Sequence, residues 1–159
     1  LVPSWSKEIS NKYATFNARI ESIGSKPAFR NAWRNNQKCL IPALGYYEWR
    51  EEDGMKQPYF VTPENRQPLV FAGIWDECQF DGAALKSCTI ITTESKGELT
   101  ELHARMPVML SVDKARRWLD CDNDKDILLD DKMQKLTVYK VDRRVNNSRQ
   151  EDESLILPI

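Results

Sequence analysis

The only histidine of the 159-residue chain is His103, so any imidazole chemistry takes place around that position. Histidine is the side chain whose unperturbed pKa lies nearest to neutral pH, which suits it to transfer protons. Arg105 follows two residues later and carries a permanent charge on a planar group that fits phosphate oxygens. Met106-Pro107 stops any helix and opens an apolar run, which predicts a turn that presents His103 and Arg105 beside a core strand. The alternative is a lone surface histidine in a turn.

Glu48 is the second candidate, because it lies in the aromatic run Gly45-Tyr46-Tyr47-Glu48-Trp49. A carboxyl group among aromatic side chains is disfavoured in its charged form, which raises its pKa toward a range useful for acid or base work. The alternative is a strand glutamate that faces water beside Arg50. Trp49 either packs in the core or offers a stacking surface to a nucleobase, and Trp5 leaves the same choice open.

Asn17 and Arg19 form a third candidate pair. The segment 14–20 alternates well enough for a strand, with Phe16, Ala18 and Ile20 on one face. Asn17 and Arg19 then share the opposite face, one pleat apart. One alternative is that both are solvated strand residues. The other is that they form a site with Glu48, His103 and Arg105. Such a site would supply an amide, groups for acid and base work, and two guanidinium groups.

The four cysteines provide neither a metal site nor a recognisable nucleophile. Cys39, Cys78, Cys88 and Cys121 form no Cys-x-x-Cys pair and no metal-ligand spacing with His103. We therefore expect no metal and no cofactor. Cys39 and Cys88 lie in apolar strand-like runs, which predicts buried free thiols and a reducing, cytoplasmic compartment.

Length and composition indicate one globular domain spanning residues 1–159. The net charge of −1 excludes a uniformly basic nucleic-acid binder. Residues 1–50, however, contain eight Lys and Arg against three Glu, which allows one basic face on a neutral chain. No apolar run approaches the ~20 residues of a membrane span, and no signal peptide is evident.

The pattern of apolar residues predicts strands that alternate with turns rather than with helices. A helix is expected from a Ser25 cap to about Asn35, and a second from a Ser111 cap through Leu119, with Val112, Ala115 and Leu119 on its inner face. Asp53-Gly54 predicts a hairpin turn. Because no strand–helix–strand alternation appears, the fold class is α+β and mostly antiparallel. The expected strands are 14–20, 38–42, 44–50, 58–61, 69–75, 87–93, 106–110 and 136–141, with a loop at 76–84, one helical turn at 96–102 and a short helix near 127–129.

Six segments of the chain match, in order, the motifs of one family. The chain resembles the SOS-response-associated peptidase (SRAP) domain, the family of abasic-site shielding proteins, over essentially its whole length. The segments are Leu-Val-Pro-Ser-Trp (1–5), Phe-Asn-Ala-Arg-Ile-Glu (16–21), Gly-Tyr-Tyr-Glu-Trp (45–49), Cys-Thr-Ile-Ile-Thr-Thr (88–93), Leu-His-Ala-Arg-Met-Pro-Val (102–108) and Val-Asn-Asn-Ser-Arg (145–149).

This resemblance implies a strongly curved, mostly antiparallel sheet that forms a pseudo-barrel with a few short helices. It implies binding of single-stranded DNA and covalent capture of abasic sites, as part of the SOS response to DNA damage, by an amino-terminal cysteine that closes a thiazolidine on the sugar aldehyde. The implied catalytic residues are Asn17, which orients the linkage, Glu48, which handles protons in processing and crosslinking, and His103, which opens the sugar ring. The implied DNA contacts are Trp5, Arg19, Trp49, Thr92 and Arg105.

The sequence departs from the family pattern at its start, since the Met-Cys-Gly-Arg stretch is absent before Leu1. We therefore expect the chain as written to be a fragment that cannot form the crosslink, and the full-length protein to have peptidase and lyase-like activity. We also expect it to be cytoplasmic and associated with the nucleoid, bound to single-stranded DNA, without membrane or metal, and monomeric. Two alternatives stay open. One is a non-catalytic single-stranded DNA-binding module, and the other is an ordinary cysteine peptidase that uses Cys39 or Cys88 with His103.

Overall fold

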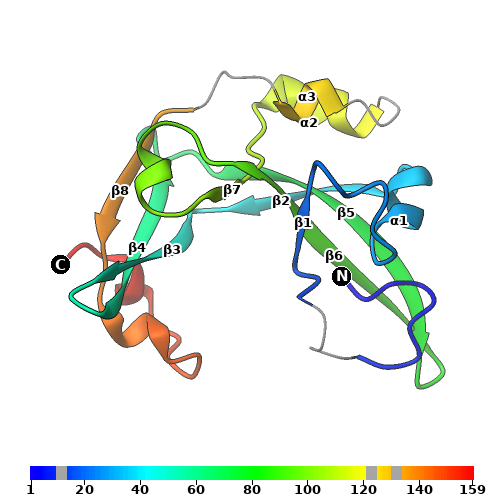
Figure 1. Cartoon of the computed structure of the whole chain (residues 1–159), viewed down its shortest axis with the longest axis horizontal. Helices are drawn as coiled ribbons and strands as arrows, with labels where there is room; N and C mark the ends of the chain where they lie inside the picture. The colour runs from blue at the N-terminus through cyan, green and yellow to red at the C-terminus, as the bar shows by residue number, and fades with distance from the viewer. Residues whose placement is uncertain (10–13, 121–124, 130–133) are drawn as a thin grey trace. The chain divides into compact units, whose positions relative to one another are not determined.

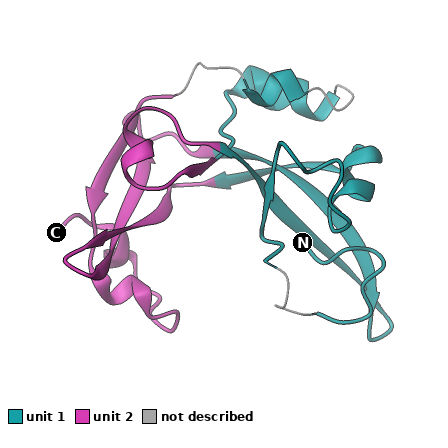
Figure 2. Ribbon diagram, in the orientation of Figure 1, with its two compact units in different colours: residues 1–42, 70–93, 107–132 teal, residues 43–69, 94–106, 133–159 magenta. Residues whose placement is uncertain are grey.

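The computed structural model describes residues 1–9, 14–120, 125–129 and 134–159. The chain forms two compact units, and each unit is assembled from three separate stretches of sequence (Figures 1 and 2). Unit 1 comprises residues 1–42, 70–93 and 107–132, and unit 2 comprises residues 43–69, 94–106 and 133–159. The predicted class is confirmed, because the described chain contains eight strands, mostly antiparallel, and a few short helices.

The first sheet has the strand order β1-β6-β5-β2, and β7 also pairs with β6. Its strands are β1 (Asn17–Arg19), β2 (Lys38–Ala43), β5 (Leu69–Phe80), β6 (Ala83–Glu94) and β7 (Arg105–Pro107). β5 and β6 form a long antiparallel hairpin, whereas β1 runs parallel to β6. The sheet is therefore mixed, and the parallel pairing with β6 holds the strand that carries Asn17 and Arg19.

The core of unit 1 lies between this sheet and three helices, α1 (Arg30–Arg34), α2 (Val112–Asp120) and α3 (Lys125–Leu129). Trp118 of α2 is fully buried, its ring centroid lies 6.0 Å from that of Trp33, and its indole N–H donates to the Cys39 carbonyl at 3.2 Å. Burying two indole rings contributes several kcal/mol to folding, on the order of 2 kcal/mol or more for each ring. The helices thus anchor β2 from the apolar side.

The second sheet has the order β3-β4-β8 and belongs to unit 2 (Figure 1). Its strands are β3 (Tyr46–Glu52), β4 (Met55–Pro63) and β8 (Leu136–Lys140), all antiparallel. The predicted hairpin turn is confirmed, because Asp53 and Gly54 both have positive φ, 50° and 73°, as a two-residue turn of this hand requires. Three short 3-10 helices complete the described chain: η1 (Gly97–Glu101), η2 (Arg143–Asn146) and η3 (Glu153–Ile156).

Several predicted elements are wrong in detail. The predicted loop 76–84 is instead strand and turn, because Asp81-Gly82 supplies a second turn with positive φ and joins β5 to β6 directly. The first helix begins at Arg30, since Ser25 uses its hydroxyl on the Ser22 carbonyl rather than as a helix cap.

Two predicted faces also differ from the structure. Helix α2 buries Ala115 and Trp118, while Val112 and Leu119 are exposed, so its inner face is rotated from the predicted one. Phe16 is 68% exposed, because regular β1 begins only after it.

Across the described residues, none of the helices combines the length and the apolar character that a membrane crossing requires.

Candidate functional site

Glu48 lies in the middle of β3, and alternation along this strand separates its charged residues from its aromatic ones. Glu48, Arg50 and Glu52 point to one face of the β3-β4-β8 sheet, whereas Tyr47 and Trp49 point to the other. The registers place Tyr59 and then Lys140 beside Glu48 on the charged face. The sequence therefore places a carboxyl group and an indole ring next to each other in the chain but on opposite faces of the sheet.

Glu48 and His103 lie within electrostatic reach of each other in unit 2. Burial raises the pKa of the Glu48 carboxyl above its usual range, and only part of that rise is offset by His103 and by the Trp49 backbone N–H. The half-burial predicted for Glu48 is thus confirmed. Tyr46, two residues earlier on the same face, is also half-buried, and burial together with the nearby Glu48 raises the pKa of its phenol. No role is proposed for Tyr46 from the sequence, although this residue belongs to the same aromatic run as Glu48.

His103 is presented by a closed turn rather than by a free loop. Helix η1 is tied by Leu99, whose side chain is buried and whose carbonyl accepts from the backbone N–H of His103 at 3.1 Å. The Ser95 N–H donates to the Ala104 carbonyl at 3.0 Å and closes the base of the turn. The imidazole Nδ1 lies 3.1 Å from the N–H and 3.0 Å from the carbonyl of Arg105. Because the backbone holds Nδ1, Nε2 is the ring nitrogen that can exchange a proton with a ligand.

Glu52 lies two pleats from Glu48 on the same strand face, and its pKa is shifted in the opposite direction. Lys140, Tyr59 and Arg50 all direct hydrogen-bond donors at its carboxylate, and they lower its pKa to about 2. One strand face therefore carries one carboxyl group that holds its proton more readily than usual and one that stays ionised. Such a division of pKa values is a common way to separate a proton-transferring carboxyl group from a structural one.

Trp49 belongs to a row of aromatic rings on the other face of the sheet. Tyr47 lies opposite Phe60, and Phe60 opposite Tyr139, with ring centroids 5.2 and 6.0 Å apart. The Trp49 ring is 6.3 Å from that of Tyr47 and is 38% exposed, and its indole N–H donates to the Asn146 side-chain oxygen at 2.7 Å. Trp49 is thus an exposed ring with a fixed orientation.

Unit 1 carries Asn17, Arg19 and Thr92. The parallel register pairs Asn17 with Ile90 and Arg19 with Thr92. Asn17 and Arg19 are exposed while Ala18 between them is fully buried, which confirms the shared face predicted for them. Thr92 is buried, and its hydroxyl lies 3.5 Å from the Ala18 carbonyl. Thr92 therefore helps to hold β1, and the described geometry gives its hydroxyl little exposure to a ligand.

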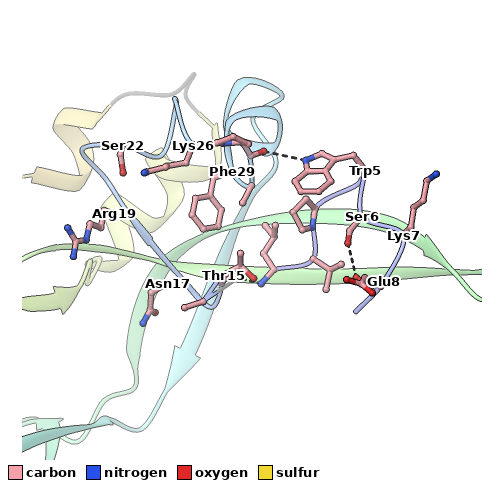
Figure 3. A pocket seen from close by; sticks show the side chains of 16 residues that line it. Trp5, Ser6, Lys7, Glu8, Thr15, Asn17, Arg19, Ser22, Lys26 and Phe29 are labelled. Atoms are coloured by element: carbon pink, nitrogen blue, oxygen red, sulfur yellow. Dashed lines mark hydrogen bonds between the residues drawn. The ribbon is translucent and has the colours of Figure 1, made fainter. Parts of the chain in front are cut away.

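A cavity of about 810 Å³ lies in unit 1, and Trp5, Asn17 and Arg19 all line it (Figure 3). In this view Phe29 lies between Trp5 and Arg19, and the Trp5 indole N–H reaches the Pro27 carbonyl at 3.4 Å. Lys7 and Lys26 also line the cavity. These two cations were not singled out from the sequence, although the basic excess of residues 1–50 pointed to such a surface.

Cys39 is half-buried rather than buried as predicted, and it does not offer an activated thiolate. Burial and the adjacent Cys88 raise the pKa of Cys39 to about 12, so its thiol stays protonated. Cys78 is buried as a free thiol, whereas Cys88 is exposed, which corrects the prediction of a buried strand residue. Cys121 lies outside the described residues. Within the described ranges, no cluster of three or more His, Cys, Asp or Glu side chains is placed to hold a metal ion.

The eight candidate residues therefore fall into two groups. In unit 1, Trp5, Asn17 and Arg19 line one cavity, and Thr92 pairs with Arg19 from the neighbouring strand β6. In unit 2, Glu48 lies within electrostatic reach of His103, and the backbone of Arg105 contacts the His103 ring. Trp49 lies on the opposite face of β3 from Glu48.

Comparison with known proteins identifies relatives over nearly the whole sequence. The family model described as SOS response associated peptidase (SRAP) matches residues 1–148. The chain is 33% identical to the abasic site processing protein YoaM of Bacillus subtilis over 163 residues, which covers 98% of this chain and 71% of that protein. It is also 33% identical to the abasic site processing protein HMCES of Xenopus tropicalis over 175 residues, covering 94% of this chain and 52% of that protein.

Solved structures share the fold. A crystal structure of a protein from Bacteroides thetaiotaomicron superposes with a TM-score of 0.83 at 26% identity, covering all of this chain and 74% of that one. A second, from Bordetella bronchiseptica, superposes with a TM-score of 0.74 at 30% identity, covering 79% of this chain and 64% of that one.

Proposed function

The chain belongs to the SOS response associated peptidase (SRAP) family, and on that premise we propose that it acts on abasic sites in single-stranded DNA. The relatives named as abasic site processing proteins support this substrate. In the full-length protein the proposed reaction is covalent capture of the abasic sugar by an amino-terminal cysteine, with processing of the amino terminus as a preceding step. The proposed cellular context is the SOS response to DNA damage, with the protein acting in the cytoplasm as a monomer on single-stranded DNA.

The observation that carries the proposal is the pairing of Glu48 with His103. Burial raises the pKa of the Glu48 carboxyl, and the backbone N–H and carbonyl of Arg105 hold Nδ1 of the His103 ring. A carboxyl group that keeps its proton more readily than usual and an imidazole within its reach are the kinds of groups that interconversion of a sugar hemiacetal and its aldehyde requires.

The proposed chemistry has two steps. In the first, His103 removes the proton of the anomeric hydroxyl and returns a proton to the ring oxygen. The bond from C1′ to the ring oxygen breaks with its electron pair on that oxygen, and C1′ becomes the aldehyde carbon. In the second, the cysteine amine adds to that carbon, and an amine proton passes to the carbonyl oxygen to make a hydroxyl group. Glu48 protonates this hydroxyl, which leaves as water, and takes back the remaining nitrogen proton as the imine forms. The thiol then adds to the imine carbon, with its proton passing to nitrogen. The net change is loss of one water.

The remaining candidates serve recognition in this proposal. Asn17 offers an exposed amide that orients the linkage. Arg19 and Arg105 contact phosphates, because guanidinium groups bind phosphate oxygens through two donors at once. Trp49 and Trp5 provide exposed rings on which bases stack. Thr92 is the weakest of these assignments, since its side chain is buried.

The proposal is tested with the full-length protein and an oligonucleotide that bears one abasic site. We expect an adduct that survives denaturation, with the mass of protein plus DNA minus one water. An intact oligonucleotide of the same sequence is the control and should give none. Saturable binding without any adduct would instead support the non-catalytic DNA-binding module. Cleavage of general protein substrates that is lost in Cys88→Ala would support the cysteine peptidase.

The two proposed phosphate contacts predict the salt dependence of DNA binding. Arg19→Ala and Arg105→Ala should each weaken binding to single-stranded DNA, and each should reduce the slope of log K against log salt concentration by about 0.7. Arg144 is the matched control, because Asp142 and Asp152 already neutralise its charge at 3.1 and 3.8 Å. Arg144→Ala should leave the slope unchanged. A titration of binding by fluorescence anisotropy at several salt concentrations measures all three, and an unaltered slope removes that arginine from the interface.

A further inference from the structure

Asn146 is the polar partner of the exposed ring of Trp49. It ends η2, ninety-seven positions along the chain from Trp49, and its side-chain oxygen accepts the indole N–H at 2.7 Å. Its amide nitrogen faces the Lys56 carbonyl on β4 at 3.5 Å. The two contacts agree on the orientation of the amide, because the oxygen faces a donor and the nitrogen faces an acceptor.

The Trp49 ring is thereby held from two directions. Tyr47 contacts it along β3, and Tyr47 in turn packs on the buried ring of Phe60. Asn146 holds the polar edge of the same ring. An indole on an exposed strand otherwise samples several rotamers. Here the ring is fixed while 38% of the residue stays open to solvent.

We propose that Asn146 is a positioning residue, which holds the Trp49 indole in the orientation that stacks on a nucleobase of single-stranded DNA. This inference rests on the proposed function, because it needs Trp49 to contact DNA. A stacking ring that is already fixed avoids the loss of side-chain freedom that binding otherwise imposes, and that loss corresponds to about two- to tenfold in Kd for one side chain. Asn146 acts through Trp49 and does not itself contact the base.

A double-mutant cycle on binding of a single-stranded thymidine oligonucleotide tests the proposal. Trp49→Ala should raise Kd by about 5- to 150-fold, the range for loss of one base-stacking contact. Asn146→Ala should raise Kd by about two- to tenfold. Trp49→Phe keeps a ring but cannot donate a hydrogen bond to Asn146. It should therefore weaken binding about as much as Asn146→Ala does. In the Trp49→Phe background, Asn146→Ala should then change Kd by less than about twofold.

Asn147→Ala is the matched control, since Asn147 is the neighbouring residue and its side chain accepts from the Arg149 N–H at 3.1 Å rather than from Trp49. Its Kd should equal that of the unmodified protein. An equal effect of Asn146→Ala with and without the Trp49 indole would show a merely structural role and overturn the proposal. If Asn146→Ala does not fold, Trp49→Phe alone decides, because unweakened binding by that variant also overturns it.

Failure of the two proposals can be told apart. If Trp49→Ala weakens binding while Asn146→Ala and Trp49→Phe bind normally, Trp49 stacks on DNA without help from Asn146, and only the positioning role is lost. If Trp49→Ala binds as tightly as the unmodified protein, the role of Trp49 in the proposed function is wrong, and the inference about Asn146 is wrong with it.

Discussion

Replacement of Glu48 by Gln is expected to slow formation of the abasic-site adduct by the full-length protein by about 10²- to 10⁴-fold, the range for loss of one general acid or base. Gln keeps the size and polarity of the side chain but cannot transfer a proton. Binding of the same oligonucleotide should change little, because Glu48 is not one of the proposed phosphate or stacking contacts. The measurement is the single-turnover rate of adduct formation on a denaturing gel, beside the Kd.

The same substitution should make the protein more stable at neutral and alkaline pH. Because burial raises the pKa of Glu48 in the folded state, the folded protein binds a proton there more readily than the unfolded chain does. The stability associated with this proton is present below the unfolded pKa and is lost as pH rises through the folded pKa. Glu48→Gln cannot lose the proton. Its denaturation midpoint should therefore exceed that of the unmodified protein at pH 8 and approach it at pH 4.

Glu52→Gln is the control on the same strand face, and its effect on stability should have the opposite sign to that of Glu48→Gln. Lys140, Tyr59 and Arg50 lower the pKa of Glu52 to about 2, so its stabilising contribution is present above the unfolded pKa and is lost as pH falls toward 2. Glu52→Gln should be less stable than the unmodified protein at pH 7 while it forms the adduct at nearly the normal rate. Similar rates for Glu48→Gln and the unmodified protein would remove Glu48 from proton transfer.

Local sequence signals predicted the elements of the fold better than their faces and lengths. The Asp53-Gly54 turn was predictable because two adjacent residues that tolerate positive φ leave few other structures. Asp81-Gly82 carries the same signal, but its position in a polar stretch made the region resemble a loop rather than the tip of a long hairpin. The inner face of α2 was missed because Trp118 lies next to Leu119, and only packing against Trp33 decides which of the two is buried.

In the candidate site, too, local features could be predicted from the sequence whereas long-range contacts could not. The half-burial of Glu48 followed from its aromatic neighbours, and the shared face of Asn17 and Arg19 followed from strand alternation. The approach of His103 to Glu48 and the bond from Trp49 to Asn146 could not be predicted, because they join residues about 55 and 97 positions apart. Such contacts depend on tertiary packing that no local pattern encodes. The exposure of Cys88 was missed for the same reason.

Gly45, immediately before β3, should tolerate no side chain. A Cβ at this position would lie 2.4 Å from the Val61 carbonyl oxygen and 2.4 Å from the Phe60 ring. The carbonyl belongs to the backbone of β4 and cannot rotate away, and Phe60 is held by Tyr47 and Tyr139. Gly45→Ala must therefore separate β3 from β4 or displace Phe60. Overpacking of this kind costs about 1–3 kcal/mol, which corresponds to about 2 to 12 °C in thermal midpoint for a chain of this size.

Gly24→Ala is the matched control for this change, because a Cβ there would meet only the Trp33 ring at 3.4 Å, an ordinary contact. Its thermal midpoint should equal or slightly exceed that of the unmodified protein, since Ala restricts the unfolded chain more than Gly does. Equal midpoints for Gly45→Ala and Gly24→Ala would contradict the close approach of β3 and β4. A lowered midpoint for Gly45→Ala, together with weaker DNA binding, would instead show that this approach holds both Glu48 and the Trp49 ring in place, since both lie on β3 within four residues of Gly45.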